Sequence, residues 1–441
     1  MRILLSACLA AALCVAGLAP SKASAGTAAV SPRVRIVQED GRYRLLVDGQ
    51  PFLVKGAGMG GDDQETLAAR GGNSFRTWST GTDDAEVRAM LDRAQRNGLK
   101  VTMGIDVGNE RHGFDYDDAA AVAAQRERIR AEVRLYKDHP AVLMWAAGNE
   151  LNLHYSNPKV WDAIGQIADM IHAEDPDHPV MTTLAGFDKP LIDLLKARAP
   201  SLDLIGIQLY GDIGALPEKL RTSGWTGPYV VTEWGPTGHW ESPLTAWKAP
   251  IEDDASRKAD LLRQRYEQVI AADREQGLGS YVFLWGDKQE RTPTWYGLFL
   301  PTGESTPSVD VMQYVWTGRW PANRAPSIRP LRLQGRVALD SVVLEAGQPA
   351  TAQVEAADAD ADGDALRYRW TVLHESMATS IGGDHEDVPP PVALAMEDDG
   401  RGGVRFTAPE APGAYRLFVE VHDGRGHAAY ANLPFKVDAA R

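Results

Sequence analysis

The sequence predicts a large (β/α)8 barrel followed by a small all-β sandwich. Between residues 51 and 316, short apolar runs rich in β-branched residues alternate with longer amphipathic segments. Eight such runs in about 265 residues match the size of a closed barrel, which typically takes roughly 250 residues. After a proline-rich stretch at 321–326 the helical pattern stops, and only short strands separated by turns follow.

The first element along the chain is a secretory signal. Met1 and Arg2 give a positive start, residues 3–18 are almost entirely apolar, and Ala23-Ser24-Ala25 has the small-x-small pattern of a cleavage site. We expect a signal peptide at 1–25, cleaved after Ala25, and therefore a secreted or periplasmic protein. Both cysteines, Cys8 and Cys14, lie in that segment. The mature chain then lacks the thiols needed for disulfides, cysteine nucleophiles or thiolate metal sites.

A hairpin and eight strand–helix units come next. Residues 35–38 and 42–47 flank Glu39-Asp40-Gly41, which predicts a hairpin that covers the floor of the barrel. The expected barrel strands are 52–57, 72–78, 100–105, 141–147, 180–184, 204–209, 229–232 and 280–285. The expected helices include 85–97, 119–136, 159–172, 191–197 and 255–275. An open doubly wound sheet is the alternative, but the glycine-rich run 56–61 contains no GxGxxG and opens no helix, which favours the barrel.

The C-terminal part divides into a linker and a β domain. We expect the barrel at 34–320, a linker at 321–327 and a sandwich at 328–441, with strands at 350–356, 366–373, 403–407, 414–422 and 428–437. The run VEVHDGRG at 419–426 resembles the closing strand and turn of immunoglobulin-like or PKD-like modules of exported bacterial enzymes. Such a module is expected to be a spacer or a binding accessory.

The charge distribution restricts the partners. The net charge is −14 and the acidic residues are scattered, which argues against nucleic acid and anionic membranes. After the signal peptide no apolar run approaches the length of a membrane span. Nothing in the sequence requires more than a monomer, and nothing calls for a cofactor.

Two glutamates end predicted barrel strands. Glu150 ends the fourth strand and Glu233 the seventh, and the carboxyl ends of all strands in such a barrel face one active-site mouth. A single carboxylate at a strand end is more often a cap or an ion-pair partner, but two at these positions favour catalysis. Retaining glycosidases use such a pair about 5–5.5 Å apart, one as acid/base and one as nucleophile. We assign Glu150 as acid/base, kept protonated partly by the charge of Glu233, which is the nucleophile.

These motifs resemble a known group. The run DHPAVLMW at 138–145, continuing into Gly148-Asn149-Glu150, resembles the clan A glycoside hydrolases and most closely the family 2 catalytic barrel. Thr232-Glu233-Trp234-Gly235 is similar to the nucleophile motif of that group. The resemblance covers residues 34–320 and implies retaining hydrolysis of β-linked oligo- or polysaccharides. It departs from family 2 in having only a short hairpin before the barrel, where family 2 enzymes usually carry sandwich domains.

The resemblance also implies substrate-binding roles. Arg76 matches an arginine beside the nucleophile, Asn149 a residue that binds the sugar 2-hydroxyl, and Tyr210 a tyrosine that hydrogen-bonds the nucleophile. Trp285, at the end of the eighth strand, matches an aromatic floor of the central sugar subsite. Further tryptophans near predicted loops are candidates to extend the cleft: Trp78, Trp234, Trp240 and Trp295.

Three questions stay open at this level. The acidic run at 358–364 has calcium-like spacing, but Arg369 stands where an EF-hand needs a glutamate, so we expect no metal. A transglycosylase with the same glutamates is one alternative. A non-catalytic carbohydrate-binding barrel is another: loss of either glutamate would favour it, and both are present. The sugar, the linkage and the endo or exo mode are decided by loops whose shapes the sequence does not give.

Overall fold

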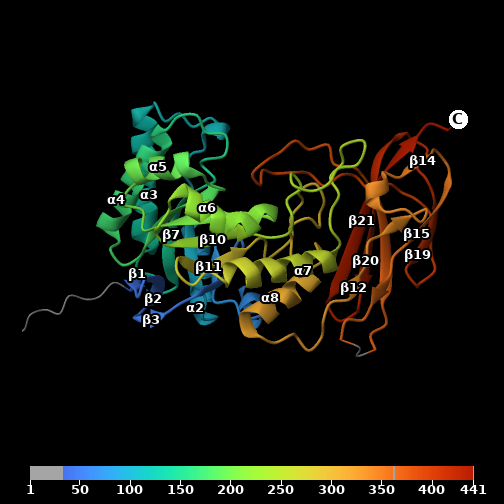
Figure 1. The fold of residues 1–441 in the computed structure, drawn as a ribbon, viewed down its shortest axis with the longest axis horizontal. Helices are drawn as coiled ribbons and strands as arrows, with labels where there is room; N and C mark the ends of the chain where they lie inside the picture. Colours follow the sequence, from blue (N-terminus) through green and yellow to red (C-terminus); the bar gives the residue numbers. More distant parts are fainter. Residues whose placement is uncertain (1–32, 361–362, 441) are drawn as a thin grey trace, which may run out of the picture. The chain divides into compact units, whose positions relative to one another are not determined.

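The computed structural model describes residues 33–360 and 363–440, so the predicted signal peptide and its cleavage site lie outside the described residues. Residues Pro32–Arg441 form one compact unit. Its centre is a closed barrel of eight parallel strands in the order β10-β11-β4-β5-β6-β7-β8-β9, which confirms the predicted fold class (Figure 1). The strands are β4 (Val54–Gly58), β5 (Ser74–Arg76), β6 (Lys100–Ile105), β7 (Val142–Asn149), β8 (Val180–Ala185), β9 (Leu204–Gln208), β10 (Tyr229–Trp234) and β11 (Gly277–Val282).

Helices follow the strands and close the outside of the barrel. They are α1 (Gln64–Ala69), α2 (Asp84–Arg96), α3 (Ala119–Tyr136), α4 (Lys159–Glu174), α5 (Lys189–Arg198), α6 (Leu216–Ser223), α7 (Ala255–Arg265) and α8 (Pro307–Thr317). Asp83 and Asp118 cap α2 and α3, because each side chain accepts hydrogen bonds from two otherwise unpaired backbone N–H groups. The predicted bounds of α3 agree with the structure at both ends.

The last predicted barrel helix is shorter than expected. α7 ends at Arg265, continues as a π-helical turn over Tyr266–Ile270, and stops before the predicted end at 275. Asp273 ends it, because one carboxylate oxygen accepts from the backbone N–H groups of Glu275 and Gln276. The chain therefore enters β11 at Gly277, three residues earlier than the predicted strand start at 280.

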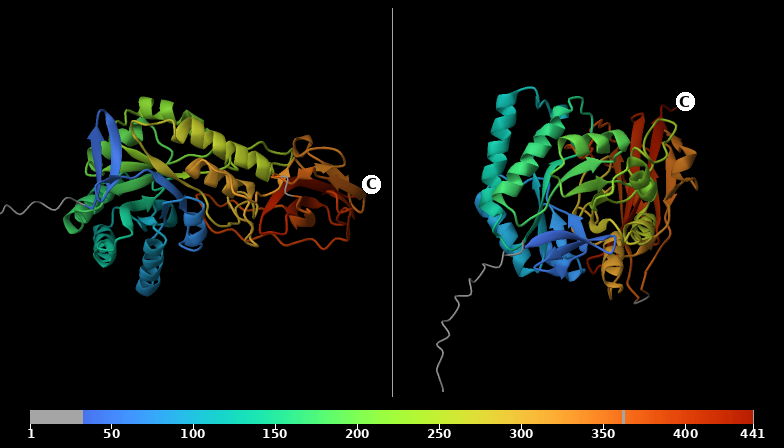
Figure 2. Two further views of the ribbon diagram at one scale, coloured as in Figure 1. Left: turned by 90° about the horizontal axis from the view of Figure 1, so that it is seen from below. Right: turned by 60° about the vertical axis from the view of Figure 1, so that its left-hand side comes forward.

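The N-terminal hairpin covers the barrel floor, as predicted. β1 (Val34–Glu39), β2 (Arg42–Val47) and β3 (Gln50–Pro51) form a small antiparallel sheet, drawn in blue in Figure 2. Its apolar face packs on the inward-facing side chains of the barrel strands. The buried members of this cluster are Val34, Leu45, Val47, Val54, Leu143, Met144, Ala146, Met181, Leu204, Val230, Leu278 and Tyr281.

The C-terminal domain is a sandwich of two four-stranded sheets, ordered β13-β15-β19-β18 and β14-β21-β20-β17. The strands are β12 (Ser327–Ile328), β13 (Arg332–Leu333), β14 (Val343–Glu345), β15 (Pro349–Gln353), β16 (Ala356–Ala357), β17 (Arg367–His374), β18 (Met396–Asp398), β19 (Gly403–Thr407), β20 (Gly413–His422) and β21 (Ala428–Asp438). Asn323, in the predicted linker, donates to Asp423 at 2.7 Å, so this stretch is attached to the sandwich.

Two further observations concern membranes and metals. Across residues 33–360 and 363–440, no helix combines the length and apolar character that a bilayer span needs. Within the same ranges, no three His, Cys, Asp or Glu side chains converge as a metal site. Ala361 and Asp362 of the acidic run lie outside the described residues, so the absence of calcium there stays a prediction.

Candidate active site

Both predicted catalytic glutamates line one cavity at the carboxyl end of the barrel. Glu150 directly follows β7 and Glu233 lies within β10. The cavity has a volume of about 740 Å³. Small-molecule sites usually measure roughly 300–1,000 Å³, so the cavity can hold a short glycan.

Glu233 is held by three donors. Its Oε1 accepts from Arg76 Nη1 at 3.0 Å and from Trp78 Nε1 at 2.8 Å. Its Oε2 accepts from the Tyr210 hydroxyl at 3.1 Å. The glutamate is buried together with the arginine, and hydrogen bonds to charged groups are stronger than neutral ones. The carboxylate is therefore fixed in one orientation with its charge balanced.

Asn149 is oriented by the same arginine. Its Oδ1 accepts from Arg76 Nη2 at 2.7 Å, Gln208 Nε2 at 2.8 Å and Thr183 Oγ1 at 3.1 Å. Because three donors surround the side-chain oxygen, the amide NH2 is the group left to donate into the cavity. This orientation suits a contact to a sugar hydroxyl.

Glu150 has a different environment. Its backbone has φ 52°, in the left-handed region that non-glycine residues rarely adopt, and such strain concentrates at functional sites. Among the described residues, no side chain or backbone group donates a hydrogen bond to its carboxyl group. Burial, reinforced by the charge of Glu233, raises its pKa to about 8, while Arg76 and Arg111 act in the opposite direction. Glu150 is therefore protonated at neutral pH and can act as an acid.

An aromatic wall stands beside the glutamates. Tyr210 packs edge to face against Trp240 at 5.5 Å and against Tyr296 at 5.5 Å, and Trp78 packs in the same way against Phe283 at 5.8 Å. Trp240 is 60% exposed at the rim although its ring is large and apolar. Aromatic faces suit the C–H faces of pyranoses, so this wall is a candidate sugar platform.

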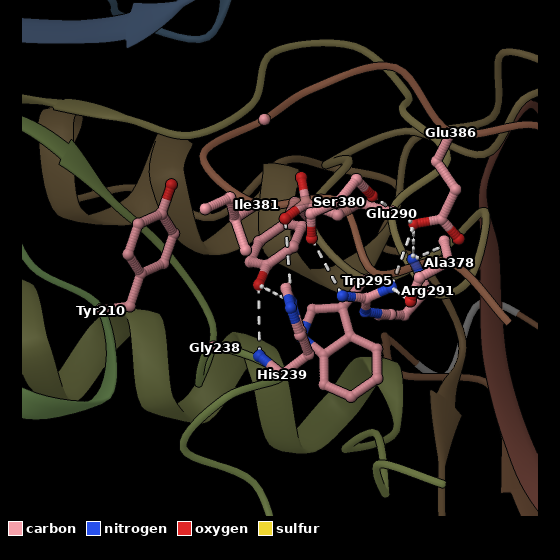
Figure 3. A network of polar contacts seen from close by, with 12 residues as sticks. Tyr210, Gly238, His239, Glu290, Arg291, Trp295, Ala378, Ser380, Ile381 and Glu386 are labelled. Atoms are coloured by element: carbon pink, nitrogen blue, oxygen red, sulfur yellow. Dashed lines mark hydrogen bonds and ion pairs between the residues drawn. The ribbon is translucent and has the colours of Figure 1, made fainter. Parts of the chain in front are cut away.

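A polar group adjoins the aromatic wall (Figure 3). His239 Nδ1 lies 3.0 Å from the Tyr296 hydroxyl, and burial, with the charge of Arg291, lowers the pKa of His239 to about 4. Glu290 accepts from Lys288 Nζ at 2.7 Å, and burial raises the pKa of this carboxyl. The histidine is therefore neutral at physiological pH, and Glu290 is a further carboxyl group in the cavity, beside Glu150, Glu233, Asp212 and Glu241.

Three of the predicted aromatic residues, Trp285, Trp234 and Trp295, do not line the cavity. Trp285 is buried, packs on Phe299 at 5.2 Å and Trp316 at 5.8 Å, and does not line the cavity. β11 ends at Val282, before the predicted end at 285, so strand alternation does not carry through to Trp285; Phe283 lines the cavity instead.

Trp234 is the second. It follows Glu233 on the same strand, and successive side chains of a strand point to opposite faces. Its ring therefore lies between the barrel and the helices, 6.0 Å from Tyr266. Trp295 is likewise buried, and its Nε1 donates to the Thr237 carbonyl at 2.9 Å.

Other predicted residues do meet at Glu233, and further lining residues were missed. Arg76, Trp78, Asn149 and Tyr210 come together around the nucleophile candidate, as described above. Gln208 could have been found, because it lies two residues before Tyr210 at the end of β9. His239, Glu290 and Tyr296 belong to the long loops 235–254 and 283–306, which have no strand or helix period to orient them.

Part of the barrel is similar to a known protein family. Residues 63–235 match the family model described as glycosyl hydrolases family 2, TIM barrel domain. A comparison with curated protein sequences finds no match.

Solved structures share the fold at low sequence identity. The β-D-glucuronidase of Dictyoglomus thermophilum is 16% identical with a TM-score of 0.50, covering 65% of this chain and 54% of that one. The β-glucuronidase of Bifidobacterium dentium is 19% identical with a TM-score of 0.51, covering 65% and 49%. That of Ruminococcus gnavus is 17% identical with a TM-score of 0.50, covering 65% and 53%. This chain thus spans about half the length of these structures, and at such identities the likeness concerns the fold.

The family model includes both glutamate motifs, since Glu150 and Glu233 fall within residues 63–235. The solved structures agree with the closed eight-stranded barrel seen here. Residues 63–235 of this chain are thus similar to the TIM-barrel domain of the family 2 glycoside hydrolases.

Proposed function

We propose that this protein is a retaining glycoside hydrolase that cleaves β-linked oligo- or polysaccharides. One observation carries the proposal: the carboxyl groups of Glu150, which follows β7, and Glu233, in β10, share a cavity, and that of Glu233 accepts from Arg76, Trp78 and Tyr210. Glycosidic cleavage needs an acid for the leaving oxygen and an anion for the anomeric carbon.

The reaction has two displacements. Glu233 attacks the anomeric carbon while Glu150 gives its proton to the departing glycosidic oxygen, which leaves a glycosyl ester on Glu233. Glu150, now a carboxylate, takes a proton from water, and the hydroxide attacks the same carbon and releases Glu233. Asn149 donates to the sugar 2-hydroxyl in both steps. The stereochemistry at the anomeric carbon is retained because it is inverted twice.

The experiment measures products of the full chain on β-glucans, mannans, galactans and uronic-acid glycans, with the anomer identified by NMR. Glu150→Gln and Glu233→Gln are the variants, and Glu218→Gln, on the exposed face of α6, is the control. We expect a β-anomer as first product, lost in both active-site variants and kept in the control. An α-anomer would contradict the retaining mechanism.

Leaving-group chemistry separates the two roles. A dinitrophenyl glycoside departs without protonation, so Glu150→Gln should still form the glycosyl-enzyme from it and release a burst of dinitrophenol. Glu233→Gln should show no burst with any leaving group. Products longer than the substrate would identify a transglycosylase, and sugar binding without turnover would identify a binding protein.

Export is a separate part of the proposal. It rests on the charge and apolar pattern of residues 1–25. N-terminal sequencing of the protein from culture medium or periplasm should give a mature chain beginning at Gly26. Retention of the whole chain in the cytoplasm would contradict it.

A further inference from the structure

The loop that joins β17 to β18 lies at the catalytic cavity. Its residues 375–389, called here the β17–β18 loop, belong to the C-terminal sandwich. Ile381, Gly382 and Gly383 line the same cavity as Glu150 and Glu233. The sandwich, which the sequence suggested was a spacer or accessory, therefore contributes directly to the site.

The loop occupies an arc of the barrel mouth where the barrel supplies little. The segments after β4 and β5 are short, residues 59–63 and 77–83. Of the described residues that line the cavity, only Trp78 comes from the segments after β4, β5 and β6. Because β4, β5 and β6 stand between β11 and β7 in the barrel, this arc would be open without another element.

The β17–β18 loop contacts both ends of that arc. Asp384 accepts two hydrogen bonds from Arg111 Nη1, at 3.0 and 2.9 Å, and Arg111 follows β6. At the other end, Lys288, which follows β11, donates to the Gly383 carbonyl at 3.0 Å. The loop therefore spans the arc from the segment after β11 to the segment after β6.

Buried contacts fix the base of the loop. Glu386 is 7% exposed and accepts from the backbone N–H of Arg291 at 3.0 Å and from Gln289 Nε2 at 3.1 Å. The Arg291 guanidinium donates to the carbonyls of Ala378 and Ser380 (Figure 3).

The sandwich end is fixed too. Glu375 pairs with Arg416 at 2.7 Å, and Arg416 also donates to the Pro250 carbonyl of the barrel at 2.7 Å. Both bonds are buried or partly buried. The loop is therefore a preformed wall rather than a free segment.

The tip of the loop, residues 381–383, lies close to Leu153 and Lys288. Gly382 and Gly383 have φ +58° and +77°, which side chains disfavour. A Cβ on Gly382 would lie 2.9 Å from Leu153 Cδ2, and one on Gly383 would lie 3.2 Å from Lys288 Nζ. Glycine suits both positions because of the positive φ, and the two glycines line the cavity together with Ile381. Peptide N–H and C=O groups are suitable partners for sugar hydroxyls.

We propose that the tip of the β17–β18 loop, residues 381–383, is a substrate-contacting end wall of the active site that limits the length of glycan accepted. The inference rests on the proposed glycosidase function. A glycan held over the glutamates meets this wall on one side and extends across the mouth, towards the end of β8, where Ala185 and Gly186 line the cavity, and the segment after β9, where Leu209 does. Short oligosaccharides and chain ends fit this arrangement, whereas the interior of a polymer does not.

The test compares disaccharide, hexasaccharide and polymer of the glycan that the wild-type enzyme hydrolyses. In one variant of the full chain, residues 377–385 are replaced by Gly-Ser-Gly. A second variant is Ile381→Ala. The matched control is Val388→Ala, a β-branched residue of the same loop that is 57% exposed and does not line the cavity.

We expect the shortened loop to raise kcat/KM for polymer relative to disaccharide by about tenfold or more, and to raise KM for the disaccharide more than it lowers kcat. Ile381→Ala should raise that KM about threefold, and Val388→Ala should leave it unchanged. Near-ultraviolet circular dichroism establishes that each variant is folded.

The outcomes are distinguishable. The inference would be overturned if a folded shortened variant kept the polymer-to-disaccharide ratio of kcat/KM, and the KM for the disaccharide, within about twofold of wild type. The glycosidase proposal would then remain intact. If the shortened variant does not fold, equal KM values for Ile381→Ala and Val388→Ala would overturn the inference. A wild-type enzyme inactive on every glycan would overturn the proposed function, and the inference with it.

Discussion

The carboxyl end of β7 and the carboxyl end of β10 present the same chemical group in opposite environments. Glu233 in β10 is surrounded by an arginine, an indole N–H and a phenol. Glu150 after β7 has burial and a neighbouring negative charge, and its pKa rises to about 8. The chemical role of each carboxyl group therefore depends on the side chains that neighbouring strands place around it, because these set its pKa.

Replacing Arg76 should have the largest effect on the environment of Glu233. Arg76→Met leaves the buried Glu233 charge without its cation, which should lower the free energy of unfolding by about 3–5 kcal/mol. It should also reduce kcat/KM by roughly 1,000-fold or more, because Asn149 loses a donor too. Urea unfolding and initial rates measure both effects.

The control is Arg198→Met, which breaks a surface pair with Asp162 and should change stability by less than about 1 kcal/mol. An Arg76 variant as stable as this control would show that the ion pair with Glu233 adds nothing to the fold.

Loss of the neutral Tyr210 hydroxyl should reduce activity less than loss of the Arg76 cation. Tyr210→Phe removes the hydrogen bond to Glu233 Oε2 and keeps the ring. A hydrogen bond to a charged group contributes about 1.5–3 kcal/mol, so kcat should fall by roughly 10- to 100-fold. The control is Tyr155→Phe, a ring that packs on Trp161 and does not line the cavity. Equal kcat values for the two variants would show that the hydrogen bond from Tyr210 to Glu233 does not contribute to catalysis.

The two glutamate-to-glutamine variants should change the free energy of unfolding in opposite directions at high pH. The pKa of Glu150 is raised in the folded state, so its stabilising contribution is complete below its unfolded value near 4.5 and is lost as the pH rises through about 8. Glu150→Gln avoids that loss, so it should exceed wild type in stability at pH 9 by about 1–3 kcal/mol and by less at pH 5.

Glu233→Gln should be less stable than wild type at both pH values, because Arg76 loses its partner. Thermal unfolding at the two pH values checks the signs. A Glu150→Gln variant that is no more stable than wild type at pH 9 would contradict the raised pKa.

The smallest effect concerns Glu290. In wild type, kcat/KM should fall above about pH 8, where Glu150 loses its proton. Glu290 is one of the negative charges that raise the pKa of Glu150, and it ranks behind burial and Glu233. Glu290→Gln should therefore move the alkaline limb to lower pH by a few tenths of a unit. A shift to higher pH would contradict this sign.

The sequence predicted the strands well because each strand of a closed barrel is buried on both faces and appears as an apolar run. β6 was predicted with both ends correct, and β7 and β10 were recognised with Glu150 and Glu233 at their ends. The prediction from the sequence was wrong where the strand ends and side chains no longer alternate between its two faces. Trp285 was expected in the cavity, but the strand stops at Val282 and the chain there follows no strand period.

Local periodicity and the parallel strand order were enough to predict the barrel, the sandwich and the placement of two glutamates at one mouth. The elements that enclose that mouth became visible in the folded structure alone. Asp384 and Arg111 are 273 residues apart, and the loop that carries Asp384 has no helix or strand period. Contacts between two irregular segments depend on where both domains pack, and no local pattern encodes that.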